Sequence, residues 1–376
     1  MKNGKLQIGF IGCGGIANGK HFPALKKFPE LCEMVAFCDI IPERAEKAAK
    51  EYGTPDAKVY TDYNEMLKDE AIDVVHVLTP NVVHCPAAVA SFEAGKHVLS
   101  EKPMAESSAS ARKMLDAWKK SGKKFTIGYQ NRFRPEVQVL HEACAAGDLG
   151  EIYFAKAHAL RRRAVPTWGV FPNKALQGGG PLIDIGTHAL DMTLWMMDNY
   201  KPVSVTGSVF CKLGHSREAA QSNIWGPWNP DTYEVEDSAF GFIKMENGAT
   251  VYLESSWALN ILNQREAATT LCGTKAGAEM RSPLDQQFKG DTLVFNRDYH
   301  GRMTEEHFSP GGEVAYFGGK SMDAGACEAE QWLKSILNDT EPLVKPEQAF
   351  VVTQILEGIY RSAASGKEYR FDGEKR

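Results

Sequence analysis

Apolar and polar positions follow two different patterns along the chain, and the first third of the chain shows one of them. Short apolar runs alternate there with amphipathic helical stretches, which is typical of βαβ units around a parallel sheet. The apolar runs predict five strands of one open sheet, at Leu6–Ile11, Met34–Asp39, Asp73–Leu78, His97–Ser100 and Phe125–Gly128. The helical stretches lie at Pro42–Tyr52, His84–Ala94 and Ser107–Lys120, and each is closed by a glycine. This part of the chain is therefore predicted to form an α/β domain with a doubly wound parallel sheet.

After about Tyr129 the apolar runs become longer and are joined by turn signals, which predicts a mainly antiparallel sheet. The predicted strands are Val203–Phe210, Ser238–Lys244 and Thr250–Trp257, and two helices close the chain at Ala324–Leu337 and Pro346–Ala364. Between the first two of these strands, Gly214–Asp231 is rich in Trp, Pro, Asn and Gly and is the best candidate for a mobile loop. The chain has 376 residues, more than the roughly 250 to 300 at which a single core stops growing. We therefore expect two domains, 1–129 and 130–376.

Composition limits the kinds of partner and the cellular compartment that we expect for this protein. With 43 basic and 48 acidic residues the formal net charge is −5, so there is no electrostatic reason to bind nucleic acid or an anionic membrane. No apolar run approaches the roughly 18 residues of a membrane helix. The eight cysteines are scattered without a CxxC pair, which favours reduced thiols over disulfides or zinc. We expect a soluble cytoplasmic protein without a metal, whose partner is a small molecule.

A glycine-rich turn follows the first predicted strand directly. Its sequence is Gly12-Cys13-Gly14-Gly15-Ile16-Ala17, a GxGxxA pattern that opens a helix. Gly12 permits the tight turn, Gly14 lets backbone amides approach a pyrophosphate, and Ala17 allows the helix to lie close to the strand. Taken alone, the pattern is equally compatible with an ordinary glycine turn that joins a strand to a helix.

Asp39 changes that balance, because it ends the second strand at the distance expected for the acid that binds the adenosine ribose. A carboxylate at this position accepts hydrogen bonds from both ribose hydroxyls and repels a 2′-phosphate. This favours NAD over NADP. Arg44 lies nearby and could accept a phosphate, but it falls inside a predicted helix, where pairing with a glutamate or with solvent is the alternative interpretation.

Further polar residues follow the next strands, at the carboxyl ends where open α/β sheets place their ligands. They are Thr79-Pro80-Asn81 with His84, and Glu101-Lys102-Pro103. Lys102 follows a buried strand and precedes Pro103, which favours an extended backbone and permits a cis peptide bond. A lysine directed into a cleft can donate to a substrate hydroxyl or stabilise a developing alkoxide, whereas an ordinary surface lysine would need no such explanation.

The third group lies after three glycines and a proline, which open a helix at Gly178–Pro181. Asp184 and His188 are four residues apart and so share one face of that helix. A carboxylate beside an imidazole orients it and raises its basicity, as a general base requires. A structural histidine is one alternative, and a metal held by Asp184, His188 and Asp191 is another. Gly186 in mid-helix indicates that another segment approaches closely there.

Together these motifs, with Arg132-Phe133 and the final Arg361–Lys367 stretch, resemble the Gfo/Idh/MocA family, the glucose-fructose oxidoreductase and inositol dehydrogenase group. The resemblance spans nearly the whole chain. It implies a Rossmann domain followed by an α/β domain whose open sheet serves dimer or tetramer contacts. It also implies that Lys102, Asp184 and His188 match the family's catalytic lysine, aspartate and histidine.

Substrate recognition is expected from the segment before the catalytic helix. Arg161-Arg162-Arg163 and Trp168, with the loop residues Trp225 and Trp228, would offer apolar faces to sugar C–H groups and donors to hydroxyls. A basic strand end beside a buried tryptophan is the alternative. The expected cofactor contacts are Gly12, Gly14, Gly15, Ile16, Ala17, Asp39, Ile40, Arg44, Thr79, Pro80, Asn81, His84, Glu101, Lys102 and Asn131. The expected substrate contacts are Lys102, Tyr129, Arg132, Arg163, Trp168, Asp184 and His188.

The function expected from all of these features is an NAD-dependent dehydrogenase or reductase. It would transfer a hydride between the cofactor and a secondary alcohol carbon of a sugar, glycoside or cyclitol, and it would form a homodimer or homotetramer through the second sheet. Two alternatives stay open. One is an NAD-dependent glycosidase of the same family that acts by transient oxidation, and the other is a non-catalytic dinucleotide or sugar sensor.

Overall fold

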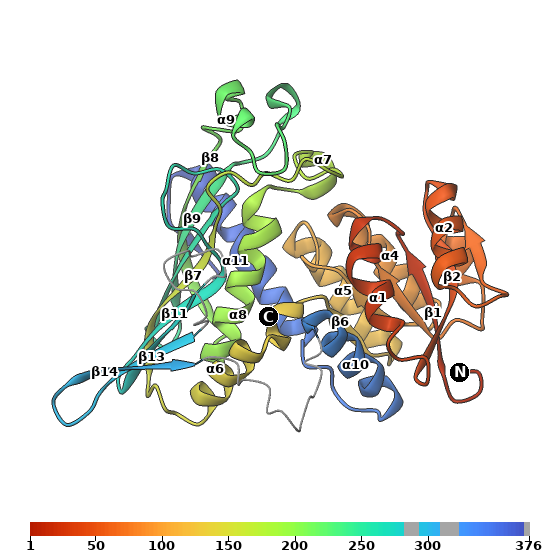
Figure 1. The fold of residues 1–376 in the computed structure, drawn as a ribbon, viewed down its shortest axis with the longest axis horizontal. Helices are drawn as coiled ribbons and strands as arrows, with labels where there is room; N and C mark the ends of the chain where they lie inside the picture. Colours follow the sequence, from red (N-terminus) through yellow and green to blue (C-terminus); the bar gives the residue numbers. More distant parts are fainter. Residues whose placement is uncertain (282–292, 309–322, 372–376) are drawn as a thin grey trace, which may run out of the picture. The chain divides into compact units, whose positions relative to one another are not determined.

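The computed structural model describes residues 1–281, 293–308 and 323–371 (Figure 1). Contacts divide the chain into two compact units. The first is Met1–Gln130 with Met322–Phe350, and the second is Asn131–Ser321 with Val351–Arg376. The first unit thus includes a segment close to the C-terminus that the sequence division groups with the second domain.

A six-stranded parallel sheet forms the centre of the first unit, in the order β3-β2-β1-β4-β5-β6. Its strands are β1 (Leu6–Ile11), β2 (Cys32–Cys38), β3 (Lys58–Tyr60), β4 (Val74–Val77), β5 (His97–Ser100) and β6 (Phe125–Ile127). All five predicted strands are confirmed in one sheet. The sixth, β3, has three residues, which is too short to show a hydrophobic period. The strand order reverses between β1 and β4, the place where doubly wound sheets bind ligands.

Helices cover the sheet of the first unit, and one of them comes from the end of the chain. They are η1 (Ala17–His21), α1 (Phe22–Leu25), α2 (Pro42–Tyr52), α3 (Tyr63–Leu67), α4 (Asn81–Glu93), α5 (Ser108–Ser121) and α10 (Ala324–Leu337). Trp332 and Leu333 of α10 belong to the same buried cluster as Phe10 and Phe22. The core of the first unit is therefore completed by residues more than two hundred positions beyond the sheet.

The second unit is built on a nine-stranded sheet, in the order β14-β13-β12-β11-β7-β10-β9-β8-β15. Its strands are β7 (Ile152–Leu160), β8 (Pro202–Phe210), β9 (Ser238–Met245), β10 (Thr250–Ser256), β11 (Arg265–Gly273), β12 (Ala276–Met280), β13 (Leu293–Asp298), β14 (Met303–Phe308) and β15 (Tyr369–Arg370). Only β7 and β10 pair in parallel, and the other neighbours pair antiparallel. The predicted, mainly antiparallel sheet is confirmed.

Helices pack on one face of this sheet, as the ribbon in Figure 1 shows for α8 and α11. The helical segments are η2 (Gln130–Phe133), α6 (Pro135–Ala145), α7 (Lys174–Gln177), η3 (Leu182–Gly186), α8 (Thr187–Met197), α9 (Arg217–Gln221), η4 (Pro230–Thr232) and α11 (Pro346–Ser365), of which η2 and α11 run across a unit boundary. Helix α8 lies against β7 and β11. Ala155, Ala157 and Ala159 are buried on β7, and their small side chains allow the helix to approach closely.

The segment expected to be a mobile loop, Gly214–Asp231, contains two short helical segments and several hydrogen bonds, and its mobility stays a prediction. It contains α9 and η4, the Trp228 indole donates to the Gly214 carbonyl at 2.8 Å, and Arg217 pairs with Asp231 at 2.8 Å. Asp237 accepts from the Gly214 amide at 2.9 Å. A composition typical of loops does not reveal such bonds between side chains and backbone.

Among the described residues, the helices are all too short or too polar to span a bilayer. All eight cysteines lie in this part of the chain, and each is a free thiol.

Candidate active site

The glycine turn after β1 has the geometry of a dinucleotide-binding loop. Gly12 has a φ of +99°, and a Cβ at this position would lie 2.4 Å from the Leu78 carbonyl oxygen, so only glycine fits. A Cβ on Gly14 or Gly15 would meet nothing within 4 Å, which leaves open space in front of the loop. Ala17 is fully buried. The turn therefore fits a pyrophosphate that approaches the backbone closely.

The helix behind this turn begins as a π-helical turn, η1. The Asn18 side-chain amide donates to the carbonyls of Cys13 at 2.9 Å and Gly14 at 2.8 Å, and so fixes the loop from within. Ile16 is exposed at the loop surface. Sequence reasoning missed Asn18, although an amide at the start of a helix is a common signal for such backbone bonds.

Asp39 is 8% exposed and ties the end of β2 to the glycine turn. Its Oδ2 accepts from the Cys13 amide at 2.8 Å, and its Oδ1 accepts from the Ile41 amide at 2.9 Å. Each carboxylate oxygen retains a second lone pair for another donor. Ile40 and Arg44 are exposed beside it.

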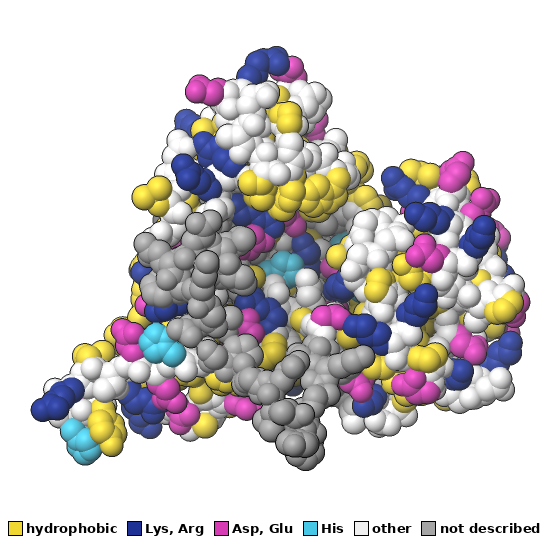
Figure 2. Space-filling view, in the orientation of Figure 1, with side chains coloured by type: hydrophobic (Ala, Val, Ile, Leu, Met, Phe, Trp, Pro, Cys, Tyr) yellow, Lys and Arg dark blue, Asp and Glu magenta, His cyan; other side chains and the backbone are white. Residues whose placement is uncertain are grey.

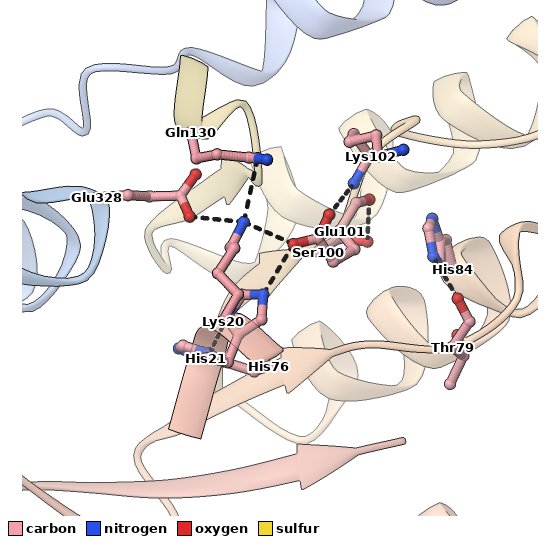
Figure 3. Close-up of polar contacts among 10 residues, drawn as sticks. All are labelled: Lys20, His21, His76, Thr79, His84, Ser100, Glu101, Lys102, Gln130 and Glu328. Carbon is pink, nitrogen blue, oxygen red and sulfur yellow. Dashed lines mark hydrogen bonds and ion pairs between the residues drawn. The ribbon is translucent and has the colours of Figure 1, made fainter. Parts of the chain in front are cut away.

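Glu101 anchors the loop that carries Lys102 (Figure 3). The Glu101 carboxylate is 4% exposed, and its Oε2 accepts from the Lys102 backbone amide at 3.0 Å. Its Oε1 lies 2.7 Å from Lys20 Nζ and 2.8 Å from His21 Nε2. A Cβ on Gly128 would lie 2.9 Å from the same oxygen, so glycine is needed there. The Lys102–Pro103 peptide bond is cis.

Lys20 joins this loop to helix α10, because its ammonium also pairs with Glu328 at 2.8 Å (Figure 3). Burial alone would lower the Lys20 pKa, but the charges of Glu101 and Glu328 raise it above its ordinary value. Burial would likewise raise the pKa of Glu101, yet Lys20 and His21 hold it well below its usual range. For Glu328 burial prevails and raises the pKa to about 7. Lys20 and Glu101 are thus a stable buried ion pair, with Glu328 close to its titration point at neutral pH.

Burial disfavours the charged form of two histidines beside this ion pair. Burial, reinforced by Lys20, lowers the pKa of His21, and burial lowers that of His76 well below its ordinary value. Their Nδ1 atoms lie 3.3 Å apart. Sequence reasoning missed Lys20, His21, His76 and Glu328, since they are far apart in the sequence and no motif links them.

His84 connects the two loops at the sheet edge rather than facing outward. It is completely buried, with Nδ1 2.9 Å from the Pro103 carbonyl oxygen and Nε2 3.0 Å from that of Thr79. Burial lowers its pKa. Thr79, Pro80 and Asn81 are partly buried at the start of α4. His84 therefore holds the loops that precede α4 and follow β5 in one arrangement.

In the second unit, Asp184 and His188 lie on consecutive segments of one helix, as predicted. Asp184 belongs to the π-helical turn η3, and His188 lies in the first turn of α8. Such turns are rare and often occur at functional sites. The Trp257 indole donates to Asp184 Oδ2 at 3.0 Å. A Cβ on Gly186 would lie 3.1 Å from Ser255 Oγ, so the close approach predicted there is confirmed.

A second buried glutamate holds the start of this helix. Glu236 Oε2 accepts from the Gly180 amide at 2.9 Å, while Oε1 accepts from the Leu182 amide at 3.1 Å and the Tyr360 hydroxyl at 2.8 Å. Burial raises the pKa of Glu236. A Cβ on Gly179 would lie 2.1 Å from the Tyr360 oxygen, which explains a glycine at that position. Neither Glu236 nor Tyr360 is part of a recognisable motif.

Arg132 lies in the core of the second unit rather than at a surface. Its side chain is completely buried, and it donates to both carboxylate oxygens of Asp191, at 2.9 and 2.6 Å. Tyr129 is also completely buried and Asn131 partly so. Within the described residues, no group of three or more His, Cys, Asp and Glu side chains could hold a metal ion. Asp191 instead forms the buried ion pair with Arg132.

Aromatic rings of the second unit form a series from Trp257, which contacts Asp184, to Trp168 and Trp225. Trp168 and Trp225 are 50% and 40% exposed, with ring centroids 4.8 Å apart. Figure 2 shows hydrophobic side chains, in yellow, gathered over the loops around α7 and below α9 in that view. Arg163 donates to Asn260 and to the Arg162 carbonyl. Trp228 is buried, so the expectation that it offers a face to a sugar is wrong; its indole is used by the Gly214 carbonyl.

Comparison with known proteins gives matches along both parts of the chain. A family described as "Oxidoreductase family, NAD-binding Rossmann fold" matches residues 6–129, and the "GFO/IDH/MocA C-terminal domain" matches residues 137–279. D-glucoside 3-dehydrogenase from Escherichia coli (strain K12) is 35% identical over 97% of both chains. Levoglucosan dehydrogenase from Pseudarthrobacter phenanthrenivorans is 28% identical over 67% of each.

A solved structure supports the same fold. Levoglucosan dehydrogenase in complex with NADH and levoglucosan superposes with a TM-score of 0.82 at 22% identity, over 98% of this chain and 100% of that one. The resemblance indicated by the motifs is confirmed by the two family matches, in the same order along the chain, and by a relative of full length. The chain belongs to the Gfo/Idh/MocA family of oxidoreductases.

Proposed function

We propose that this protein is an NAD-dependent dehydrogenase that oxidises a ring hydroxyl of a glucoside. One observation carries the proposal, namely the 35% identity to D-glucoside 3-dehydrogenase over 97% of both chains. By that likeness the reacting carbon is C3 of the glucosyl ring. Trp168 and Trp225 are exposed in the second unit and suit a glycoside substrate, since aromatic faces bind the C–H groups of sugar rings.

The glycine turn and Asp39 support NAD as the cofactor. The open space in front of Gly14 and Gly15 and the requirement for glycine at Gly12 fit a pyrophosphate. When bound, NAD would supply the hydride acceptor. Asp39 would face a 2′-phosphate with a like charge, so we expect NAD to bind at least tenfold more tightly than NADP, about 1.4 kcal/mol. Calorimetric titration with both cofactors measures this ratio, and equal affinities would contradict the role given to Asp39.

We assign the chemistry to Lys102, Asp184 and His188, as the family resemblance implies. In the oxidative direction, His188 would take the proton of the reacting hydroxyl at an imidazole nitrogen. Lys102 would donate to the same oxygen and stabilise its developing negative charge. Asp184, held by the Trp257 indole, would orient the imidazole and help to bind the sugar. Glu101 and Glu236 hold the backbone segments that carry these groups.

A substrate panel tests the proposal. Purified protein is mixed with NAD and with methyl glucosides, free sugars or inositols, NADH is followed by absorbance, and the products are identified. We expect NADH and a keto-glucoside from the glucosides. Free sugar released without net NADH would identify the glycosidase alternative, and the absence of turnover with every compound despite NAD binding would identify a sensor.

We propose a homodimer or homotetramer that forms through the sheet of the second unit. Strand β9 alternates buried and exposed residues, so one side of the sheet packs within the unit while the other exposes Phe242, which pairs with Tyr252 of β10. Exposed aromatic residues on a sheet face are typical of a contact surface. Light scattering at micromolar concentration should give at least twice the chain mass, and a clean monomer would contradict this assembly.

We also propose that the protein acts in the cytoplasm. The eight cysteines are all free, and burial raises the pKa of the thiols of Cys13 and Cys32 to about 12. Buried, protonated thiols are stable in a reducing compartment and contribute no disulfide bonds. Fractionation of the host cell with an antibody against the chain would test the location.

A further inference from the structure

The aromatic side chains of the second unit form a continuous series that leads away from Asp184. The Trp257 indole donates to Asp184 Oδ2 at 3.0 Å, and the Trp257 ring lies 6.2 Å from that of Phe171. Phe171 lies 6.2 Å from Trp168, and Trp168 lies 4.8 Å from Trp225. Scattered surface apolar residues need no explanation. Here four rings form one series. It begins at a carboxylate proposed to bind the sugar and ends in two exposed indoles, so these rings are not isolated surface residues.

Polar contacts hold the backbone segments that carry the two exposed indoles at the end of this series, Trp168 and Trp225. The Thr167 hydroxyl donates to the Trp225 carbonyl at 2.9 Å, and the buried Asn223 amide donates to the carbonyls of Val165 and Gly226 at 3.0 and 2.7 Å. The loop that carries Trp225 is therefore tied to the segment that leads to Trp168. Because these contacts hold the backbone, little ordering of the backbone would oppose binding to the two rings.

The charge beside the two indoles is offset. The Arg161 guanidinium lies 5.2 Å from the Trp225 ring centroid and forms an ion pair with Glu266. Arg161 thus supports one side of the Trp225 ring without presenting an unpaired cation to a ligand. The indoles meet at an interplanar angle of 72°, so the two partly exposed rings form a corner. Such a corner suits a neutral six-membered ring that has an apolar face.

From this geometry we infer that Trp168 and Trp225 form a subsite for a second ring, attached to the glucosyl unit through its anomeric oxygen. The inference rests on the proposed function, since it takes the glucosyl ring to lie at Asp184. The ligand chemistry is a ring with an apolar face, either aromatic or a second pyranose. Inositols and methyl glucosides lack such a ring and would leave the corner empty.

The test compares three glucosides of the same anomeric form: methyl glucoside, phenyl glucoside and a disaccharide. We expect the wild-type protein to have a KM at least tenfold lower for phenyl glucoside or the disaccharide than for methyl glucoside. Trp168→Ala should reduce this preference to less than threefold, and Trp168→Phe should restore part of it. Ile224→Ala removes an exposed apolar side chain from the loop that carries Trp225 and should preserve the preference. A preference for phenyl glucoside alone would identify an aromatic group as the occupant, and a preference for both would identify any ring.

Calorimetric titration of phenyl glucoside into the same variants separates this inference from the proposed function. Loss of binding in Trp168→Ala, with no NADH formed from any glucoside, would support the subsite and overturn the proposed dehydrogenase. Normal NADH formation with equal KM values for all three glucosides would overturn the subsite and leave the dehydrogenase. An equal loss for all three compounds in Trp168→Ala would also overturn it, because the ring would then serve the glucosyl unit itself.

Discussion

Two buried glutamates, one in each unit, accept hydrogen bonds from backbone amides, but their pKa values shift in opposite directions. Glu101 is 4% exposed and accepts from the Lys102 amide, while Glu236 is 6% exposed and accepts from the Gly180 and Leu182 amides. The charge of Glu101 is met by the Lys20 ammonium, and its pKa is held well below the usual range. No cation is found among the hydrogen-bond partners that the described structure gives Glu236, and burial raises its pKa.

The difference shows two ways to hold in place a backbone segment that carries proposed catalytic residues. A carboxylate paired with a buried cation stays ionised, but it depends strongly on that one partner, since removal of the cation leaves an uncompensated charge. A carboxylate held by several neutral donors depends less on any one of them. Both arrangements use the C-terminal helices, because Glu328 of α10 pairs with Lys20 and Tyr360 of α11 donates to Glu236.

The largest expected effects come from the groups that the two anchors support. Lys102→Ala and His188→Ala should each lower turnover by roughly a hundredfold to ten-thousandfold, the usual contribution of a general base or of a charge placed at the reacting oxygen. NAD affinity, measured by calorimetry, should change little. Asp184→Asn should keep the shape but shift the pH dependence of turnover. Lys119→Ala, on the exposed side of α5, is the control. Near-normal rates in His188→Ala and Asp184→Asn would mean that the helix is structural.

Removal of the cation tests the first anchor. Lys20→Met should lower the free energy of unfolding by about 3–5 kcal/mol, because it leaves Glu101 and Glu328 buried without their counter-charge. Denaturant titration measures this loss. Adding Glu328→Gln to the same protein should recover part of it, because one buried charge is removed. Lys27→Met breaks a comparable but exposed pair with Asp323 and should cost less than about 1 kcal/mol. Equal losses of stability in the two lysine variants would mean that Glu101 does not depend on its buried cation.

The pH dependence of stability tests the charge state of the same network. Burial raises the pKa of Glu328 from an ordinary 4.5 to about 7 in the folded protein, so the folded state binds more protons than the unfolded state between these values. Wild-type stability should therefore fall relative to Glu328→Gln as pH rises from about 4.5 to about 7, by about 3 kcal/mol at most. The difference between the two proteins cancels the contributions of the histidines. A difference that stays constant across this range would mean that Glu328 titrates normally.

The smallest effect is expected at the second anchor. Tyr360→Phe removes one of several neutral donors to Glu236 and should lower the free energy of unfolding by about 1–2 kcal/mol. Tyr299→Phe, at an exposed position, is the matched control and should have no measurable effect. Urea titration of both variants provides the comparison. A loss in Tyr360→Phe as large as that in Lys20→Met would show that the two anchors depend on their partners to the same degree.

Local pattern was enough to predict much of the fold. Strand β1 and helices α2 and α10 have the predicted bounds, because a period of two or 3.6 residues and a terminal glycine or proline are properties of the segment itself. Strand β7 was not predicted. Its buried face is formed by Ala155, Ala157 and Ala159, and alanine is too weakly apolar to mark a strand by alternation. Its position between β10 and β11 depends on pairing with distant segments.

What the sequence by itself determined about this protein is the chemistry that lies within a few neighbouring residues. The need for glycine at Gly12 and the shared helix of Asp184 and His188 are of this kind, since backbone angles and helical spacing are local. Only the tertiary structure decided that Arg132 would be neutralised by Asp191 and that Lys20 would lie between Glu101 and Glu328. The physical reason is that a buried charge must find its partner wherever the chain brings one within a few ångströms, and that proximity is created by packing between segments far apart in the sequence.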